Sequence, residues 1–275
     1  NTRSVKNNVL QRANLKLPYA FTVVETLTPQ IVEAFFADKP YIDVKGRGWE
    51  DLALCEPLAD HLSYQLDQTD IVSKFSVFAK NNLIYGTAIS KIVWSTRRPS
   101  PTAEVTFDGI DLVNIELQDF YPDWSATNPG DIQSMRGCVH RAWRTLSQIK
   151  EKERTEDGFG IYHNIDKLEE SLKVYGNNAW DIISMPPDDK MSQLKDNKNY
   201  TSGIKTGDKI EIWEYWGIFS PNDDGVFEEY VITVANGSTV IRMDKNPLKN
   251  QYKPFIAAVN YAIPNEFYGQ GEILP

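Results

Sequence analysis

Residues Lys209–Met243 have the sequence KIEIWEYWGIFSPNDDGVFEEYVITVANGSTVIRM. Branched and aromatic side chains dominate three runs, which are separated by Asn222-Asp223-Asp224-Gly225 and by Asn236-Gly237. An Asn-Gly pair between two such runs is the strongest short-range signal of a β-hairpin, because both central residues of its turn need a positive φ. The stretch therefore predicts an antiparallel meander with strands at Lys209–Phe219, Val226–Ala235 and Ser238–Met243.

Upstream of the meander, further extended runs predict more antiparallel strands. They are rich in Val, Ile and aromatic residues, and turn-forming residues such as Asp108-Gly109 separate them. The predicted strands are Thr87–Trp94, Ala103–Phe107, Leu112–Leu117 and Arg136–Arg144. Between the last two, Asp119–Trp124 is predicted to be a rigid loop, because Pro122 fixes its own φ and favours an extended Tyr121.

Two helices are predicted directly before these strands. The first has leucines spaced by four residues, which form one apolar stripe: Leu54, Leu58, Leu62 and Leu66. The second begins after Thr69 or Asp70, either of which can cap it, and ends at Gly86, where a left-handed cap is expected. Its predicted buried side consists of Ile71, Phe75, Phe78 and Ile84.

Three shorter helices are predicted elsewhere. Thr28-Pro29 would start one that runs to Phe36, because proline is favoured at the first helical position. Thr145 and Gln148 have the spacing of a capping box, so a helix should begin there and carry Lys150, Lys152 and Arg154 toward its end. The third spans Ile165–Tyr175 and is terminated by Gly176.

These elements predict an α+β fold, with N-terminal helices packed on antiparallel β-sheets and a β-meander near the C-terminus. We expect four segments along the chain: an N-terminal segment at 1–48, a helical pair with strands at 49–154, a polar excursion at 155–208 and the meander at 209–275. The sequence starts without Met and stops at Pro275, so we expect it to be part of a longer protein.

The composition excludes several classes of protein. The 275 residues carry 29 Lys and Arg against 38 Asp and Glu, a net charge of −9, which argues against tight binding of nucleic acid over the whole surface. Two cysteines cannot form a disulfide framework, so a reducing compartment is expected. Apolar runs such as Phe255–Val259 are far shorter than a membrane span needs, and we expect a soluble protein.

No catalytic, metal or cofactor site is predicted. The chain has neither a phosphate-binding loop motif nor a serine-hydrolase elbow. Cys138 and His140 share a strand face, but no third residue is available to orient them. Three acidic pairs could hold a cation, yet turn formation explains them better: Asp119 with Asp123, Asp188-Asp189 and Asp223-Asp224.

Positive charge is concentrated between residues 91 and 154. The candidate residues for a subunit interface or a DNA-facing surface are Arg97, Arg98, Arg136, Arg141 and Arg144. Such a zone could meet nucleic acid or a negative patch on a neighbouring subunit. Solvated strand edges that charge protects from aggregation would give the same pattern equally well.

The order of these elements resembles a known family. The helix that ends at Gly86 leads into Gly86-Thr-Ala-Ile-Ser-Lys-Ile-Val-Trp94, and then come Asp119-Phe-Tyr-Pro-Asp123 and Met135-Arg-Gly-Cys-Val-His-Arg-Ala-Trp143. This succession, with the meander and Ile263–Gly271 after it, is similar to the wing region of the portal proteins of tailed bacteriophages. The resemblance covers most of residues 50–275.

The resemblance implies a structural role without enzymatic activity or cofactors. Portal proteins form a ring, usually a dodecamer, at one capsid vertex, through which a separate terminase motor pumps double-stranded DNA. The expected partners are identical subunits, terminase, capsid, scaffolding and tail-adaptor proteins, and DNA that passes without tight binding. The expected location is the virion, after assembly in the host cytoplasm and without any membrane, and the family's stem and clip would follow Pro275.

Two other functions stay open at this point. One is a soluble β-rich binding module, carbohydrate-binding or tail-associated, that uses exposed aromatic side chains. The other, with less support, is a hydrolase with an unrecognised site. Under the portal interpretation, we expect the basic zone around Arg141 to meet acidic residues such as Glu228 and Glu229 of a neighbour, so that Arg141→Glu should disturb ring assembly.

Overall fold

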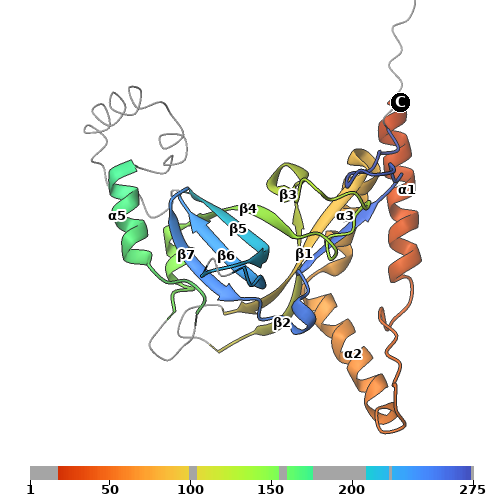
Figure 1. Cartoon of the computed structure of the whole chain (residues 1–275). Helices are drawn as coiled ribbons and strands as arrows, with labels where there is room; N and C mark the ends of the chain where they lie inside the picture. The colour runs from red at the N-terminus through yellow and green to blue at the C-terminus, as the bar shows by residue number, and fades with distance from the viewer. Residues whose placement is uncertain (1–17, 99–103, 155–159, 176–208, 223–224, 274–275) are drawn as a thin grey trace, which may run out of the picture.

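The computed structural model describes residues 18–98, 104–154, 160–175, 209–222 and 225–273 (Figure 1). The helices are α1 (Tyr19–Phe36), α2 (Leu52–Gln68), α3 (Ile71–Tyr85), α4 (Leu146–Lys150) and α5 (Ile165–Tyr175). The strands are β1 (Thr87–Arg97), β2 (Phe107–Ile115), β3 (Phe120–Pro122), β4 (Gly137–Thr145), β5 (Lys209–Phe219), β6 (Glu228–Ala235), β7 (Thr239–Lys245) and β8 (Phe255–Val259). The fold is α+β, as predicted.

The strands form two antiparallel sheets. The smaller sheet has the order β2-β1-β8, and the larger has the order β3-β4-β5-β6-β7. Both sheets combine strands from the predicted segments 49–154 and 209–275, since β1 pairs with β8 and β4 pairs with β5. The helices α1, α2 and α3 lie on one side of the sheets and α5 lies on the other (Figure 1).

The meander is confirmed. Asn236 and Gly237 have φ values of 51° and 70°, as the turn between β6 and β7 requires. Behind the meander, α5 packs Ile165, Leu168 and Leu172 into one of two buried clusters. The capping box is present too, because the Thr145 hydroxyl accepts from the Gln148 amide and the Gln148 side chain accepts from the Thr145 amide. This helix, α4, ends at Lys150, before Lys152 and Arg154.

Two of the predicted stretches differ in the structure, and one strand was not predicted. Ala103–Phe107 and Leu112–Leu117 are not two strands, because β2 runs continuously through Asp108-Gly109. The Asp108 carboxylate accepts hydrogen bonds from Trp94 Nε1 at 2.8 Å and Thr96 Oγ1 at 2.7 Å, so it is satisfied within the ladder and forms no turn. The loop predicted at Asp119–Trp124 contributes β3 instead, where Phe120 pairs with His140. The run Phe255–Val259 adds β8 to the smaller sheet.

The prediction for the first helix was wrong about its start. Helix α1 begins ten residues before Pro29, which lies in its interior. Contacts with α3 compensate for the hydrogen bond that a proline cannot make: Lys80 Nζ lies 2.6 Å from Glu25 Oε1, and the Phe35 and Phe75 rings are 5.1 Å apart. Tertiary packing therefore extends the helix.

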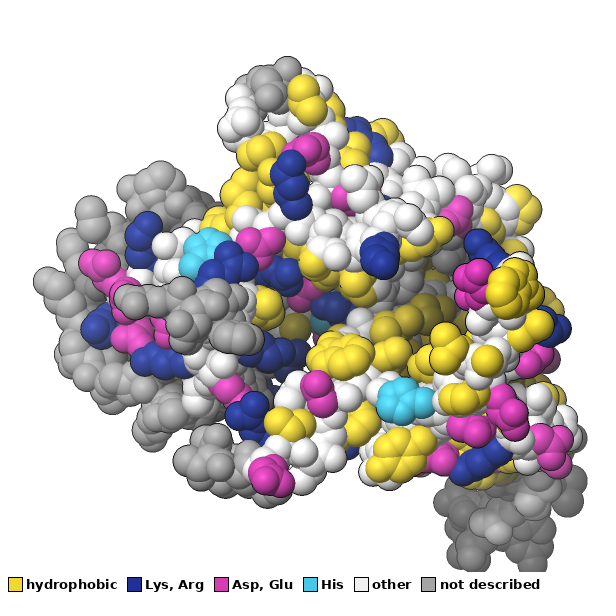
Figure 2. All heavy atoms as spheres, turned by 90° about the horizontal axis from the view of Figure 1, so that it is seen from below, with side chains coloured by type: hydrophobic (Ala, Val, Ile, Leu, Met, Phe, Trp, Pro, Cys, Tyr) yellow, Lys and Arg dark blue, Asp and Glu magenta, His cyan; other side chains and the backbone are white. Residues whose placement is uncertain are grey.

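The leucine stripe predicted for α2 does not form the buried side of the helix, and its C-terminal members Leu62 and Leu66 are only half-buried. Leu54 and Leu58 are 67% and 46% exposed, while Ala59 and Ser63 of the same helix are buried. The Ser63 hydroxyl donates a hydrogen bond to the Ala59 carbonyl at 2.9 Å, so this hydroxyl has a partner within the helix. The side of α2 that carries Ala59 and Ser63 can therefore be buried against the rest of the protein. Hydrophobic side chains therefore lie on the surface around α2, as the lower right of Figure 2 shows.

Gly86 ends α3 as predicted, with φ at 80° and its amide bonded to the Asn82 carbonyl. A Cβ at this position would overlap backbone atoms of Gly269 and Gln270, which cross directly over the turn. Gly86→Ala is therefore expected to lower the free energy of unfolding by about 2–3 kcal/mol, from left-handed strain plus the overlap.

Gly225 is the matched control for this substitution. Its φ is 79°, and a Cβ there would meet nothing within 4 Å. Gly225→Ala should thus cost only the strain, about 1 kcal/mol. Urea denaturation of both variants measures the difference in stability. Equal losses would show that the backbone at Gly269 and Gln270 can move aside without any loss of stability.

Candidate interaction surface

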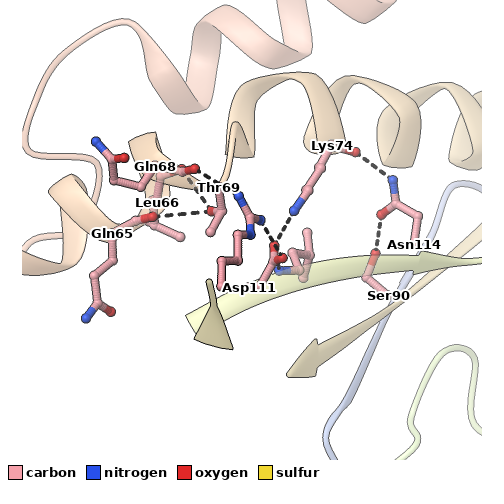
Figure 3. Close-up of polar contacts among 10 residues, drawn as sticks. Gln65, Leu66, Gln68, Thr69, Lys74, Ser90, Asp111 and Asn114 are labelled. Atoms are coloured by element: carbon pink, nitrogen blue, oxygen red, sulfur yellow. Dashed lines mark hydrogen bonds and ion pairs between the residues drawn. The ribbon is translucent and has the colours of Figure 1, made fainter. Parts of the chain in front are cut away.

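A partly buried cluster of polar side chains joins α3 to the smaller sheet (Figure 3). The Asp111 carboxylate on β2 is 10% exposed and forms ion pairs with Lys74 of α3 and, at 3.1 Å, with Arg97 Nη2 of β1. Beside it, Asn114 Nδ2 donates to the Lys74 carbonyl at 2.8 Å and Asn114 Oδ1 accepts from the Ser90 hydroxyl at 2.7 Å. Arg97 therefore forms an ion pair within its own chain.

Arg141 is likewise held within the chain, on the face of β4 that points away from the core. Its Nη2 lies 2.7 Å from Asp119 Oδ1, and Nη1 lies 3.8 Å from Glu211 Oε1. The guanidinium carbon also lies 6.0 Å and 5.9 Å from the ring centroids of Tyr121 and Trp213. The hydrogen bond from Arg141 to Asp119 raises the pKa of the guanidinium further above its usual value.

The other three candidate arginines are exposed, and none forms an ion pair within the described part of the chain. Arg98 follows the end of β1, while Arg136 and Arg144 stand near opposite ends of β4. Eight residues of extended chain separate these two by about 26 Å. The five arginines therefore do not converge on one place.

The acidic residues expected opposite this zone also have partners in their own chain. Glu228 pairs with Lys245 at 2.7 Å, and Glu229 lies 3.5 Å from the buried Lys253. The first pair joins β6 to β7 within the meander, and the second connects the meander to the segment that follows it.

Sequence patterns gave no indication of an ion pair between the two sheets. Lys91 of β1 contacts Glu214 of β5, with side chains only 12% and 15% exposed. Glu214 also accepts from Trp216 Nε1, and Lys91 Nζ lies 5.4 Å from the centre of the Phe255 ring. Burial pushes the pKa of Glu214 up, but Lys91 and the Trp216 hydrogen bond outweigh it and leave that pKa below its usual value.

Cys138 and His140 lie beside this pair and are unsuited to nucleophilic chemistry. Burial raises the pKa of Cys138 to about 12, so its thiol stays protonated at neutral pH. Burial, with the positive charge of Lys91, lowers the pKa of His140 to about 4. The His140 ring instead packs 6.0 Å from Phe255.

No group of three or more potential metal ligands occurs among the described residues. Asp119 pairs with Arg141, and Asp123 accepts from the Ser125 hydroxyl at 2.8 Å. The pairs Asp188-Asp189 and Asp223-Asp224 lie outside the described residues. Of the helices that are described, none has the length and apolar character to cross a membrane.

Several tryptophans are prominent on the surface. Trp124, Trp49, Trp94 and Trp143 are 95%, 82%, 65% and 48% exposed, whereas Trp216 is buried between the sheets. Large exposed rings of this kind commonly mark surfaces that a partner covers.

Comparison with known protein families identifies a family that this chain matches. A family model described as Phage SU10 portal protein matches residues 102–272. The match covers β2 and every helix and strand after it, which includes the whole larger sheet. It spans more than half of the sequence and agrees with the resemblance found in the wing-type elements. The chain belongs to the Phage SU10 portal protein family.

Proposed function

We propose that this chain is a structural subunit of a portal ring at the capsid vertex, which forms the channel for DNA packaging and ejection. The observation that carries the proposal is the family match over residues 102–272. In this proposal the subunit docks the terminase and tail components, contacts capsid and scaffolding proteins, and is assembled in the host cytoplasm before it joins the virion. The role is mechanical, with no reaction catalysed by the chain.

The surface of the subunit supports this role. A ring requires heterologous contacts, in which one surface of each subunit meets a different surface of the next. Exposed apolar side chains such as Trp49 and Trp94 supply area for such contacts. Of the five candidate arginines, Arg98, Arg136 and Arg144 can face a neighbour or the passing DNA without losing an ion pair within the described residues, whereas Arg97 and Arg141 would have to exchange partners.

The net charge also fits a conduit. A channel that lets DNA slide must not hold it, and a chain with a charge of −9 repels a phosphate backbone on average. Weak, strongly salt-dependent binding of duplex DNA is therefore expected.

Native mass spectrometry and light scattering test the proposal directly. The expected result is a closed ring of identical subunits, twelve if the usual portal stoichiometry applies, with negligible retention of duplex DNA at physiological salt. A strict monomer at every concentration and salt would contradict the ring.

A second function, binding of carbohydrate by exposed aromatic rings, is favoured by one observation. The exposed Tyr121 ring lies 5.2 Å from the half-buried Trp213 ring on the outer face of the larger sheet, next to Arg141. Titration calorimetry with a panel of oligosaccharides tests it. A monomer that binds sugar, and loses binding in Trp213→Ala, would favour this module over the portal subunit.

A further inference from the structure

A small cleft lies where β4 runs into α4. Its volume is about 150 Å³, and its lining residues are Arg144, Gln148, Glu151, Lys152 and Tyr162. Because side chains alternate along a strand, Arg144 lies on the same side of β4 as Cys138 and His140, which pack toward the core. Arg144 itself is exposed, because it stands near the end of the strand, where the core gives way to this cleft.

Hydrogen bonds hold both walls of the cleft in place. On one wall, the Thr145 amide donates to Gln148 Oε1 at 3.1 Å, and Gln148 Nε2 has no acceptor in the described part of the chain. On the other wall, the amides of Ile161 and Tyr162 donate to the Lys152 carbonyl at 2.9 Å and 3.0 Å. Tyr162 also belongs to the buried cluster into which α5 packs. The cleft is therefore part of the folded scaffold.

The two cations of the cleft are not neutralised within the chain. Neither Arg144 nor Lys152 has a carboxylate within ion-pairing distance among the described residues, although Lys150 close by pairs with Glu169. A surface that pairs one lysine and leaves two neighbouring cations open has room for an anion from outside.

Glu151 is the one carboxylate among the lining residues, and it does not balance these cations. The pKa of Lys152 is lowered, mainly by burial, and the charges of Arg144 and Lys91 lower it further. Glu214 and Glu151 act in the opposite direction with smaller effects. Positive charge therefore remains uncompensated in the cleft.

The chemistry of the lining suits a tetrahedral oxyanion. A guanidinium matches two oxygens of a phosphate at once, and an ammonium adds a second charge-assisted hydrogen bond. The volume lies below the range of about 300–1,000 Å³ that buries a drug-sized molecule, so it suits a phosphate group and not a whole nucleotide.

We propose that this cleft binds one phosphate group, with Arg144 and Lys152 supplying the charge and Gln148 and Tyr162 supplying further donors. The site is independent of the portal ring and adds a ligand to the subunit. Its phosphate comes either from free inorganic phosphate or from the backbone of a nucleic acid whose remainder stays outside the cleft.

Titration calorimetry with inorganic phosphate, at a constant ionic strength set with chloride, tests the site. The unsubstituted chain should bind one phosphate per subunit. Arg144→Gln with Lys152→Gln should weaken this binding at least about tenfold, because two charge-assisted hydrogen bonds are lost. The matched control is Arg136→Gln with Lys167→Gln, which removes two exposed cations outside the cleft and should bind phosphate like the unsubstituted chain.

Glu151→Gln provides a test that a damaged fold cannot imitate. It removes the carboxylate that repels the phosphate, so binding should become about two- to fivefold tighter. Circular dichroism should show unchanged folding in all these variants, since the substituted side chains are exposed.

Retention of duplex DNA by the same variants distinguishes the two sources of phosphate. A loss of retention confined to the Arg144 and Lys152 double variant, with a smaller salt dependence, would support the site and assign it to a nucleic-acid backbone. Unchanged retention with weakened binding of inorganic phosphate would support it as a site for free phosphate. Equal phosphate binding by the cleft variant and its matched control, or no saturable binding by the unsubstituted chain, would overturn the proposal and leave the portal role standing.

Discussion

Glu214→Ala is expected to lower the free energy of unfolding by about 3–5 kcal/mol, because it leaves the ammonium of Lys91 buried without a counter-ion. Lys91 is held between the two sheets, where its only carboxylate partner within the described residues is Glu214. Trp216 loses its acceptor in the same substitution. The connection between the sheets should therefore weaken, and equilibrium denaturation in urea measures the loss.

Glu228→Ala is the control for this prediction. Glu228 pairs with Lys245 at 2.7 Å, but these side chains are 41% and 65% exposed, so the expected loss is within about 1 kcal/mol. Burial is the difference between the two ion pairs. A second control, Lys91→Met with Glu214→Gln, removes both charges and retains an acceptor for Trp216, and it should recover most of the stability.

Equal losses in Glu214→Ala and Glu228→Ala would contradict the prediction, because they would mean that water reaches Lys91 in the folded protein. Failure of the double variant to recover would instead show that packing around Phe255, against which Lys91 lies, dominates the loss.

The protein is expected to lose about 3 kcal/mol of stability between pH 6.5 and pH 4 through His140 alone. Burial lowers the pKa of His140 from its usual 6.5 to about 4, with a contribution from Lys91 and Arg144, while Glu214 and Asp119 act in the other direction. Since its folded pKa lies below the unfolded one, the unfolded state takes up the proton first as the pH falls. The stability is fully present above pH 6.5 and is lost by about 1.4 kcal/mol per pH unit down to about 4.

Carboxylates titrate in nearly the same pH range as His140 is expected to. The contribution of His140 is therefore measured as the difference in stability between two proteins. Urea denaturation at several pH values, performed on the unsubstituted protein and on His140→Gln, isolates the contribution of His140 because glutamine does not titrate. The stability of the unsubstituted protein should fall more steeply from pH 6.5 to 4. Parallel curves would contradict the prediction and place the folded pKa of His140 near its ordinary value.

Local signals in the sequence were sufficient for several elements. The hairpin at Asn236-Gly237, the left-handed end of α3 at Gly86 and the capping box of α4 all depend on backbone conformations that a few neighbouring residues determine. For the same reason the predicted boundaries of α5 and β5 agree with the structure. The resemblance to portal proteins also rested on the order of such elements, and the family match agrees with it.

The interaction surface was predicted only in part. The sequence identified the basic residues but not which of them form ion pairs within the chain. Arg97 meets Asp111, and Arg141 meets Asp119, only because sheet pairing and helix packing bring them together. Lys152 was identified only as the end of a helix, and its cleft with Arg144 requires the fold around Tyr162.

The sequence by itself determined the kinds of element, the turns, the acidic balance and the family, since these follow from residue type and from spacing over a few positions. Only the tertiary structure decided that β8 completes the smaller sheet, that Lys91 and Glu214 join the two sheets, and that Leu54 and Leu58 of α2 lie on the surface. Periodicity shows that a helix has an apolar side, but not what that side meets. What it meets depends on contacts between residues far apart in the chain, and here Ala59 and Ser63 form the buried side while Leu54 and Leu58 stay exposed.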